Sequence, residues 1–239
     1  MEIKNAVALV TGANRGIGKA LVEALIKAGA KKVYATARNN HQLEFSSGET
    51  EIVTLPLDIT IHNNIQKIAD TTKDVNLLLN NAGVLDFGDI LTIPTQQIQH
   101  NLDTNFFGTL LVSRHLASVI EANGGGAIVN ILTLLSLASM PGLAAYNVSK
   151  AAAWSMTLSL RASLANKNID VHSVFPGAID TDMLAGVDMP KTKPADVAQA
   201  IIEGIQNGLE DIFPDPMSTA VYKDWTKDHK AVEKQFAQM

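Results

Sequence analysis

A tyrosine and a lysine four residues apart are the strongest candidates for chemistry in this sequence. Tyr146 and Lys150 lie near the start of a helical pattern over residues 144–166, so their side chains share one helix face. A free phenol has a pKa of about 10 and exchanges protons poorly at neutral pH, whereas a neighbouring cation lowers that pKa by favouring the phenolate. The pair is therefore suited to proton transfer at a carbonyl oxygen.

A glycine-rich turn directly follows the apolar run at residues 6–10. It reads Thr11-Gly12-Ala13-Asn14-Arg15-Gly16-Ile17-Gly18, and a helical pattern begins within it. Glycines at such a turn let backbone N–H groups and the new helix's N-terminus approach a pyrophosphate. A plain strand-to-helix turn is the simpler alternative. A nucleoside triphosphate loop does not fit, because Ala20 stands where a hydroxyl should hold magnesium and Gly12 is one residue too far from Gly18.

The end of the second apolar run indicates which dinucleotide is bound. An acidic residue about 20 positions beyond the glycines usually binds the ribose 2′-hydroxyl of NAD(H), whereas a 2′-phosphate needs a cation. This position carries Arg38, and Arg15 is available as a second cation. We therefore expect NADP(H) rather than NAD(H) as the cofactor. The alternative is that Arg38 is an ordinary solvated charge at a strand end.

Alternating strand and helix patterns are expected to position these residues. Six apolar runs are predicted strands: 6–10, 32–37, 51–57, 75–79, 127–131 and 169–175. They are apolar almost throughout, as is typical of parallel strands buried on both faces. Helical patterns cover 17–28, 61–71, 95–121, 144–166 and 194–207, with a surface helix expected in 217–239 and at most a short helix in 39–50. This alternation predicts an α/β fold, a doubly wound parallel sheet with helices on both faces.

The composition narrows the class of protein. The chain has 239 residues, a net charge of −5 and no cysteine, which predicts one domain without disulfides or thiolate metal sites. The six histidines have no metal-binding spacing, so no metal is expected. No apolar run approaches the roughly 20 residues that span a bilayer. The N-terminus does not read as a secretory signal, so a cytoplasmic location is predicted. The acidic balance argues against nucleic-acid binding.

Taken in order, the motifs resemble those of the short-chain dehydrogenase/reductase family over nearly the whole chain. The markers are residues 11–18, Asp58, Asn80-Asn81-Ala82-Gly83, Asn105, Tyr146 with Lys150, and Pro176-Gly177. The resemblance implies a Rossmann-type sheet of about seven strands. It also implies hydride transfer between a nicotinamide and an alcohol or carbonyl. Residues 1–239 would then be one dinucleotide-binding catalytic domain, with a cofactor half of about 1–130 and a catalytic and substrate half of about 131–239.

The same resemblance implies roles for individual residues. Tyr146 would be the general acid in reduction, Lys150 would hold the nicotinamide ribose and lower the tyrosine pKa, and Asn105 would anchor a water. The expected cofactor-binding set is Gly12, Asn14, Arg15, Gly16, Ile17, Gly18, Arg38, Asp58, Ile59, Asn81, Ala82, Gly83, Tyr146, Lys150, Pro176, Gly177, Ile179 and Thr181. Simpler alternatives exist for several members. Asp58 could cap the next helix, Asn105 could be a solvent-facing amide, Asn81 could terminate a strand with Asn80, and Pro176-Gly177 could be an ordinary turn pair.

One position departs from the family pattern. The family normally has a serine thirteen residues before the tyrosine, where its hydroxyl binds the substrate oxygen, and here that position is Thr133. A threonine hydroxyl can make the same bond, although its methyl group stiffens χ1 and narrows the pocket. Ser136 is the nearby alternative. We expect Thr133 to be the catalytic hydroxyl, unless it is simply a β-favouring residue at a strand end.

The expected substrate pocket is apolar. Its predicted members are Leu85, Leu135, Ser136, Met140, Leu143 and Met183. They favour reduction of apolar ketones or aldehydes, and the seventeen residues between Pro176 and Pro194 predict a short lid and broad specificity. A 3-oxoacyl-thioester reductase, a non-catalytic NADP(H) sensor or scaffold, and an isomerase or lyase remain alternatives. The 144–166 helix is apolar on more than one face, which predicts a homodimer or homotetramer.

Overall fold

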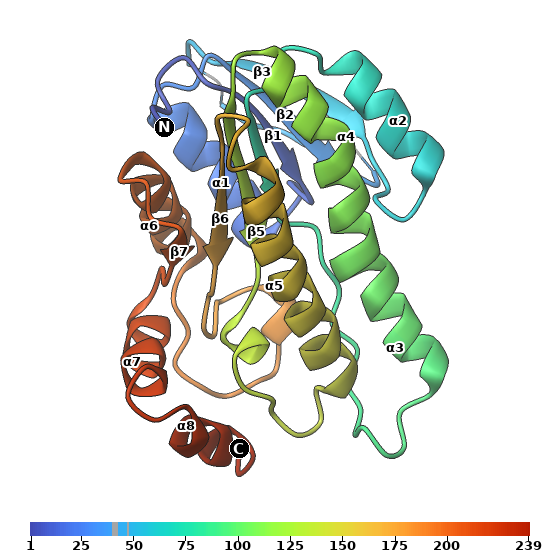
Figure 1. Cartoon of the computed structure of the whole chain (residues 1–239), viewed down its shortest axis with the longest axis vertical. Helices are drawn as coiled ribbons and strands as arrows, with labels where there is room; N and C mark the ends of the chain where they lie inside the picture. Colours follow the sequence, from blue (N-terminus) through green and yellow to red (C-terminus); the bar gives the residue numbers. More distant parts are fainter. Residues whose placement is uncertain (40–42, 47) are drawn as a thin grey trace.

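A parallel seven-stranded sheet forms the centre of the computed structural model, which describes residues 1–39, 43–46 and 48–239 (Figure 1). The strands are β1 (Val7–Thr11), β2 (Lys32–Ala37), β3 (Glu51–Pro56), β4 (Leu77–Asn80), β5 (Gly126–Ile131), β6 (Ile169–Val174) and β7 (Asp211–Ile212). Their order is β3-β2-β1-β4-β5-β6-β7, and every neighbouring pair is parallel. The predicted Rossmann-type α/β fold is confirmed.

Helices cover both faces of the sheet. On one face pack α1 (Gly16–Lys27) and α6 (Pro194–Gln206), and on the other α2 (His62–Thr71), α4 (Thr109–Ala122) and α5 (Ala144–Leu164). Successive residues of β1 face opposite layers, since Ala8 and Val10 join the first core and Val7 and Leu9 the second. Both layers consist of buried apolar side chains, which explains why the strands read as continuous apolar runs.

The connections place a crevice above the middle of the sheet. From β1 the chain runs outward through β2 and β3, then returns to β4 on the other side of β1. In such sheets ligands bind at the carboxyl ends of the strands, where this reversal occurs. Three helices extend beyond the sheet at that end: α3 (Thr95–Leu102), α7 (Pro216–Trp225) and α8 (His229–Phe236) (Figure 1).

The predicted helix over 95–121 is interrupted. A π-helical turn, η2 (Asp103–Gly108), separates α3 from α4. The turn contains Asn105, whose side-chain amide accepts a hydrogen bond from Val84 N and donates to Val84 O, each at 2.9 Å. Such bulges are rare and often occur at functional sites.

The C-terminal segment also differs from the expected surface helix. It forms two helices, and Asp228 caps the second by accepting a hydrogen bond from Ala231 N. Val232 and Phe236 of α8 are buried. The two-residue strand β7 was too short to be recognised in the sequence. Of the predicted short helix in 39–50, positions 40–42 and 47 lie outside the described residues, and the remainder is not helical.

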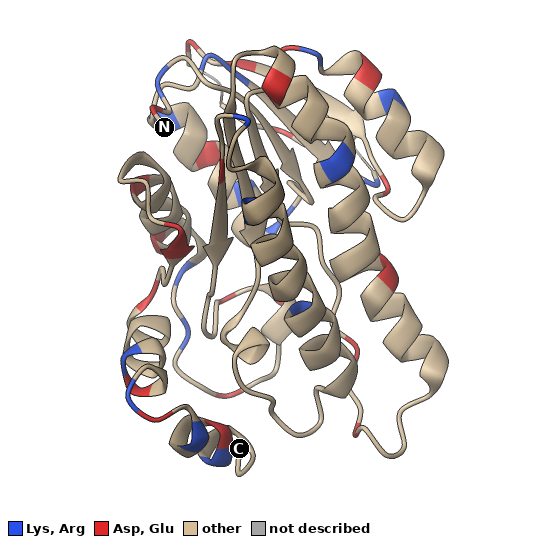
Figure 2. Cartoon of the chain, in the orientation of Figure 1, with Lys and Arg blue, Asp and Glu red and all other residues tan. Residues whose placement is uncertain are grey.

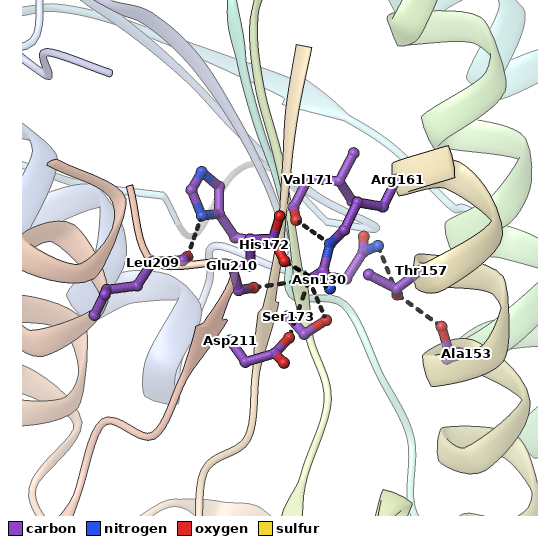
Figure 3. A network of polar contacts seen from close by, with 10 residues as sticks. All are labelled: Asn130, Ala153, Thr157, Arg161, Val171, His172, Ser173, Leu209, Glu210 and Asp211. Atoms are coloured by element: carbon purple, nitrogen blue, oxygen red, sulfur yellow. Dashed lines mark hydrogen bonds and ion pairs between the residues drawn. The ribbon is translucent and has the colours of Figure 1, made fainter. Parts of the chain in front are cut away.

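A polar network anchors α5 to the sheet (Figure 3). Asn130 of β5 donates a hydrogen bond to Thr157 of α5 at 3.0 Å. One turn further along the helix, Arg161 reaches the far edge of the sheet, with hydrogen bonds to Val171 O, Ser173 Oγ, Glu210 O and Asp211 Oδ1. These bonds hold α5 against β5, β6 and β7, and thereby position its first two turns, which contain Tyr146 and Lys150.

No helix among the described residues is both long and apolar enough to cross a membrane.

Candidate active site

A cavity of about 650 Å³ lies at the carboxyl ends of the strands. Its volume falls within the roughly 300–1,000 Å³ of ligand pockets. Segments that follow each of the seven strands contribute to it, and they bring together most of the predicted residues. The lining includes Gly12, Asn14, Arg15, Gly16, Ile17, Arg38, Asp58, Ile59, Asn81, Ala82, Gly83, Thr133, Tyr146, Lys150, Pro176, Gly177, Ile179 and Thr181, together with Leu85, Leu135, Met140, Leu143 and Met183.

Three predicted site residues do not line the cavity. A side-chain carbon at Gly18 would collide with the carbonyl of Gly12, so Gly18 lets α1 pack under the turn rather than touch a ligand. Ser136, predicted in the substrate pocket, lies in the 3₁₀ turn η3 (Leu134–Ser136), and its buried hydroxyl has no hydrogen-bond partner among the described residues. Asn105 is buried behind the loop after β4, so it is not a solvent-facing amide.

The glycine-rich turn has the shape that a bound pyrophosphate needs. Gly12 and Gly16 have φ of 66° and 53°, in the left-handed region that favours glycine. Helix α1 starts at Gly16, and its N-cap residue Arg15 supplies no side-chain cap. The first N–H groups of α1 therefore remain available to an anion, which the helix dipole also favours. These features fit a dinucleotide.

Asn81 holds this turn in place. Its side-chain amide donates hydrogen bonds to Thr11 O and Gly12 O, both at 3.0 Å. In return, Thr11 Oγ1 accepts hydrogen bonds from the N–H groups of Asn81 and Ala82. The turns after β1 and β4 are thereby joined, and the Asn81 side chain supports the cavity wall from behind.

Tyr146 and Lys150 are buried at the cavity wall, but their electrostatics differ from the prediction. Lys150 Nζ lies 5.8 Å from the centroid of the Tyr146 ring and donates a 2.7 Å hydrogen bond to Ile131 O. Burial raises the pKa of Tyr146 to about 12, and the Thr133 hydroxyl lowers it only in part. Burial also lowers the pKa of Lys150 to about 8. The expected net lowering of the Tyr146 pKa by Lys150 is therefore wrong for this arrangement, because desolvation of the phenol dominates.

Thr133 is positioned at the end of β5, beside Tyr146. It caps η3, where its Oγ1 accepts a hydrogen bond from Leu135 N at 3.3 Å. That bond uses the oxygen as an acceptor, so the hydroxyl proton can still be donated to a ligand.

Asn105 joins the site's supporting elements rather than facing the cavity. Beyond its two bonds to Val84, its amide donates to Ser149 Oγ of α5 at 2.9 Å. Its side chain thus links the loop after β4 to the helix that carries Tyr146. Its water-anchoring role stays a prediction.

Asp58 does not cap α2. It accepts hydrogen bonds from the backbone N–H and the hydroxyl of Thr60, while the N-cap of α2 is Ile61. The helix-capping alternative is therefore wrong, and Asp58 lines the cavity.

Two polar pairs at the cavity went unrecognised in the sequence. Arg15 forms an exposed ion pair with Asp182 at 3.2 Å, which links the glycine turn to the segment after β6. His100 Nδ1 lies 2.6 Å from Asp86 Oδ2, a pair that spacing in the sequence does not reveal. His41 lies outside the described residues. Within the described ranges, no group of three or more His, Asp or Glu could hold a metal ion.

Comparisons with known proteins agree with this geometry. Residues 6–191 match the family model described as short chain dehydrogenase. A short chain dehydrogenase from Burkholderia cenocepacia, solved in complex with NADP, is 34% identical with a TM-score of 0.92, and 99% of each chain is covered. A 3-oxoacyl-(acyl-carrier-protein) reductase of Synechocystis sp. is 32% identical over 74% of this chain and 75% of its own. A 3alpha-hydroxysteroid dehydrogenase of Mediterraneibacter gnavus is 30% identical over 81% of this chain and 82% of its own.

Proposed function

The chain belongs to the short-chain dehydrogenase family, and we propose that it transfers a hydride between NADP(H) and a carbonyl or secondary alcohol, chiefly to reduce apolar ketones and aldehydes. One observation carries this proposal. A single cavity connects the glycine turn and Arg38 to Tyr146, Lys150 and Thr133. A dinucleotide held by the first group would bring its nicotinamide towards the second.

The side chains have complementary roles in this reduction. The bound nicotinamide would supply the hydride to the carbonyl carbon. Tyr146 donates its phenolic proton to the carbonyl oxygen, and the Thr133 hydroxyl donates a hydrogen bond to the same oxygen as negative charge develops there. The ammonium of Lys150, 5.8 Å from the ring, stabilises the phenolate that remains. A non-catalytic sensor would need none of these three side chains at this spacing.

The substrate end of the cavity favours an apolar carbonyl over a phosphate-bearing thioester. Among the described lining residues the cations are Arg15, Arg38 and Lys150, of which the first two border the glycine turn and the end of β2. In the view of Figure 2, Lys and Arg are spread over many elements instead of being gathered on one. A coenzyme A thioester or an acidic carrier protein would be expected to need complementary cations near the entrance.

An NADPH consumption assay tests the proposed reaction. We expect oxidation of NADPH in the presence of hydrophobic ketones and aldehydes, because the lining beyond Tyr146 is mostly aliphatic and thioether side chains. A panel should include aryl ketones, aliphatic aldehydes and acetoacetyl-coenzyme A as the 3-oxoacyl thioester. Turnover of the thioester alone would favour the reductase named among the relatives and contradict our proposal.

The choice of NADP(H) is tested by replacing Arg38 with Asp. Arg38 is exposed at the end of β2 and lines the cavity, so its guanidinium is available to a 2′-phosphate. We expect the KM for NADPH to rise at least about tenfold, since a hydrogen bond to a charged group contributes about 1.5–3 kcal/mol. The KM for NADH should rise far less. Arg114→Asp, an exposed arginine on α4 outside the lining, is the matched control. An unchanged NADPH preference in Arg38→Asp would show that Arg38 is an ordinary surface charge.

We also propose that the chain acts as one domain, as expected from the sequence, and that it assembles as a homodimer or homotetramer. Val148 and Leu158 of α5 are 41% and 44% exposed, and Phe107 of η2 is 45% exposed, although large apolar side chains are usually buried. Light scattering on the purified protein measures the assembly, and a monomer would refute it. The cytoplasmic location stays a prediction.

A further inference from the structure

Methionines recur in the lining of the cavity. Five of the seven methionines in the chain line it: Met140, Met183, Met189, Met217 and Met239. They come from segments far apart in the sequence, and Phe236 of α8 joins them. We call these six residues the methionine wall. Thioether side chains are flexible and polarizable, adapt to ligands of varied shape, and make favourable contacts with aromatic rings of about 0.3–1.5 kcal/mol each.

The wall is in contact with the segment that carries the catalytic hydroxyl. Phe236 and Val232 of α8 pack in one cluster with Leu134 and Ala138. Leu134 belongs to η3, the turn that Thr133 caps. A substrate whose carbonyl oxygen reaches Thr133 would therefore extend its body towards α8.

The base of the wall is firmly attached. Asp215 caps α7 by accepting a hydrogen bond from Ser218 N and also accepts one from Gly177 N, both at 2.9 Å. A side-chain carbon on Gly177 would lie 2.9 Å from Met217 Sδ, so the glycine leaves the space that Met217 occupies. Met217 is thereby held beside the Pro176-Gly177 turn of the cofactor site.

A column of aromatic rings fixes α7 against the body of the protein. Phe175 stacks on Phe213 with ring centroids 5.1 Å apart, and Phe213 stacks on Tyr222 of α7 at 3.9 Å. Trp225, at the end of α7, lies 6.3 Å from Trp154 of α5 in an edge-on arrangement. The backbone of α7, which carries Met217, is thus held in place, and thioether side chains are themselves flexible. Met183 and Met239 are 42% and 59% exposed, which places accessible thioethers at the cavity's surface.

We propose that the methionine wall selects uncharged carbonyl substrates with a bulky aromatic or other ring-bearing apolar body, and that Phe236 and Met189 are specificity-determining residues. The proposal rests on the reductase activity proposed above and names its substrate class. None of the six wall side chains carries a charge, so a carboxylate or phosphate on the substrate would be desolvated there without a partner. The aromatic ring of a substrate would instead contact several thioether side chains at once.

The test compares two methyl ketones that differ only in the body attached to the carbonyl, 2-butanone and 4-phenyl-2-butanone. For each protein, the measured quantity is the ratio of kcat/KM for the phenyl ketone to kcat/KM for 2-butanone. We expect Phe236→Ala and Met189→Ala each to lower this ratio about tenfold, a typical loss when part of an apolar pocket is removed. Met189 lies in a loop outside α8, so its variant remains informative if Phe236→Ala fails to fold. Leu91→Ala, 89% exposed and outside the lining, is the control and should keep the wild-type ratio.

A ratio that both wall variants leave at the wild-type value would overturn the proposal. A binding measurement distinguishes failure of the proposed reductase activity from failure of the proposed role of the methionine wall. Saturation-transfer NMR with 4-phenyl-2-butanone and the NADP⁺-loaded protein reports contact with the wall without turnover. Binding that both wall variants weaken, with no NADPH oxidation by any ketone, would support the wall and refute only the proposed reaction. Absence of binding by the wild type would refute the wall.

Discussion

Replacing Tyr146 with Phe is expected to lower kcat for ketone reduction by about 10²–10⁴-fold, the usual contribution of a positioned general acid. The substitution removes one oxygen from a buried ring and leaves the rest of the cavity lining around position 146 in place. Without the phenol, Thr133 can still donate a hydrogen bond to the carbonyl oxygen, but the proposed general acid is lost. Steady-state assays with NADPH and an aryl ketone measure the loss.

The affinity for NADPH serves as the control in the same experiment. A fluorescence titration of Tyr146→Phe should give a dissociation constant for NADPH close to that of the wild type, because the Phe ring preserves the shape of the cavity lining at this position. If the variant kept more than about a tenth of the wild-type kcat, Tyr146 would not be the proton donor, and the proposed chemistry would need another acid.

The environment of Tyr146 sets the protonation state of its phenol. With a pKa raised to about 12, the phenol is protonated throughout the neutral range, which is the form that reduction consumes. The reverse reaction needs the phenolate. Lys150 stabilises that anion as an ammonium, and its pKa of about 8 leaves it mostly protonated at pH 7. Burial therefore keeps the phenol of Tyr146 protonated, whereas Lys150 remains mostly an ammonium at pH 7 although burial lowers its pKa.

The sequence predicted the sheet well because its strands are buried on both faces. Residues such as Leu9 and Val10 of β1 point to opposite layers, yet both layers are apolar, so the run reads as a strand of a parallel sheet. The glycine turn could also be predicted from the sequence. The left-handed φ of Gly12 and Gly16 explains why those positions are glycine.

Other features depend on contacts that no local pattern records. Apolar residues recur through 95–121 as in one helix, whereas the π-turn is accompanied by the hydrogen bonds of Asn105 to Val84 and Ser149. The segment 217–239 carries many charges, yet Phe236 turns inward to the cavity because α8 packs on η3. The pKa of Tyr146 was misjudged for a related reason: spacing shows that Lys150 is near, but not how completely the phenol is removed from water.

Thr133→Val should reduce kcat by about 10²-fold or more, the effect of removing one donor aimed at a developing oxyanion. Valine replaces the hydroxyl with a methyl group and keeps the branched shape, so packing at the end of β5 should change little. Ser136→Ala is the matched comparison three residues further on. Its buried hydroxyl lacks a partner among the described residues and lies outside the cavity lining, so kcat should stay within about threefold of the wild type.

The two variants should also differ in stability. Removing the Ser136 hydroxyl eliminates a buried polar group without a partner, which should leave Tm unchanged or raise it. Thr133→Val instead removes the acceptor for Leu135 N, a bond that caps η3, and should lower Tm slightly. Parallel kinetics and thermal melts therefore separate a catalytic hydroxyl from a structural one. A large loss of kcat in Ser136→Ala, with little in Thr133→Val, would reverse the assignment, because the hydroxyl that stabilises the oxyanion must face the carbonyl oxygen beside Tyr146.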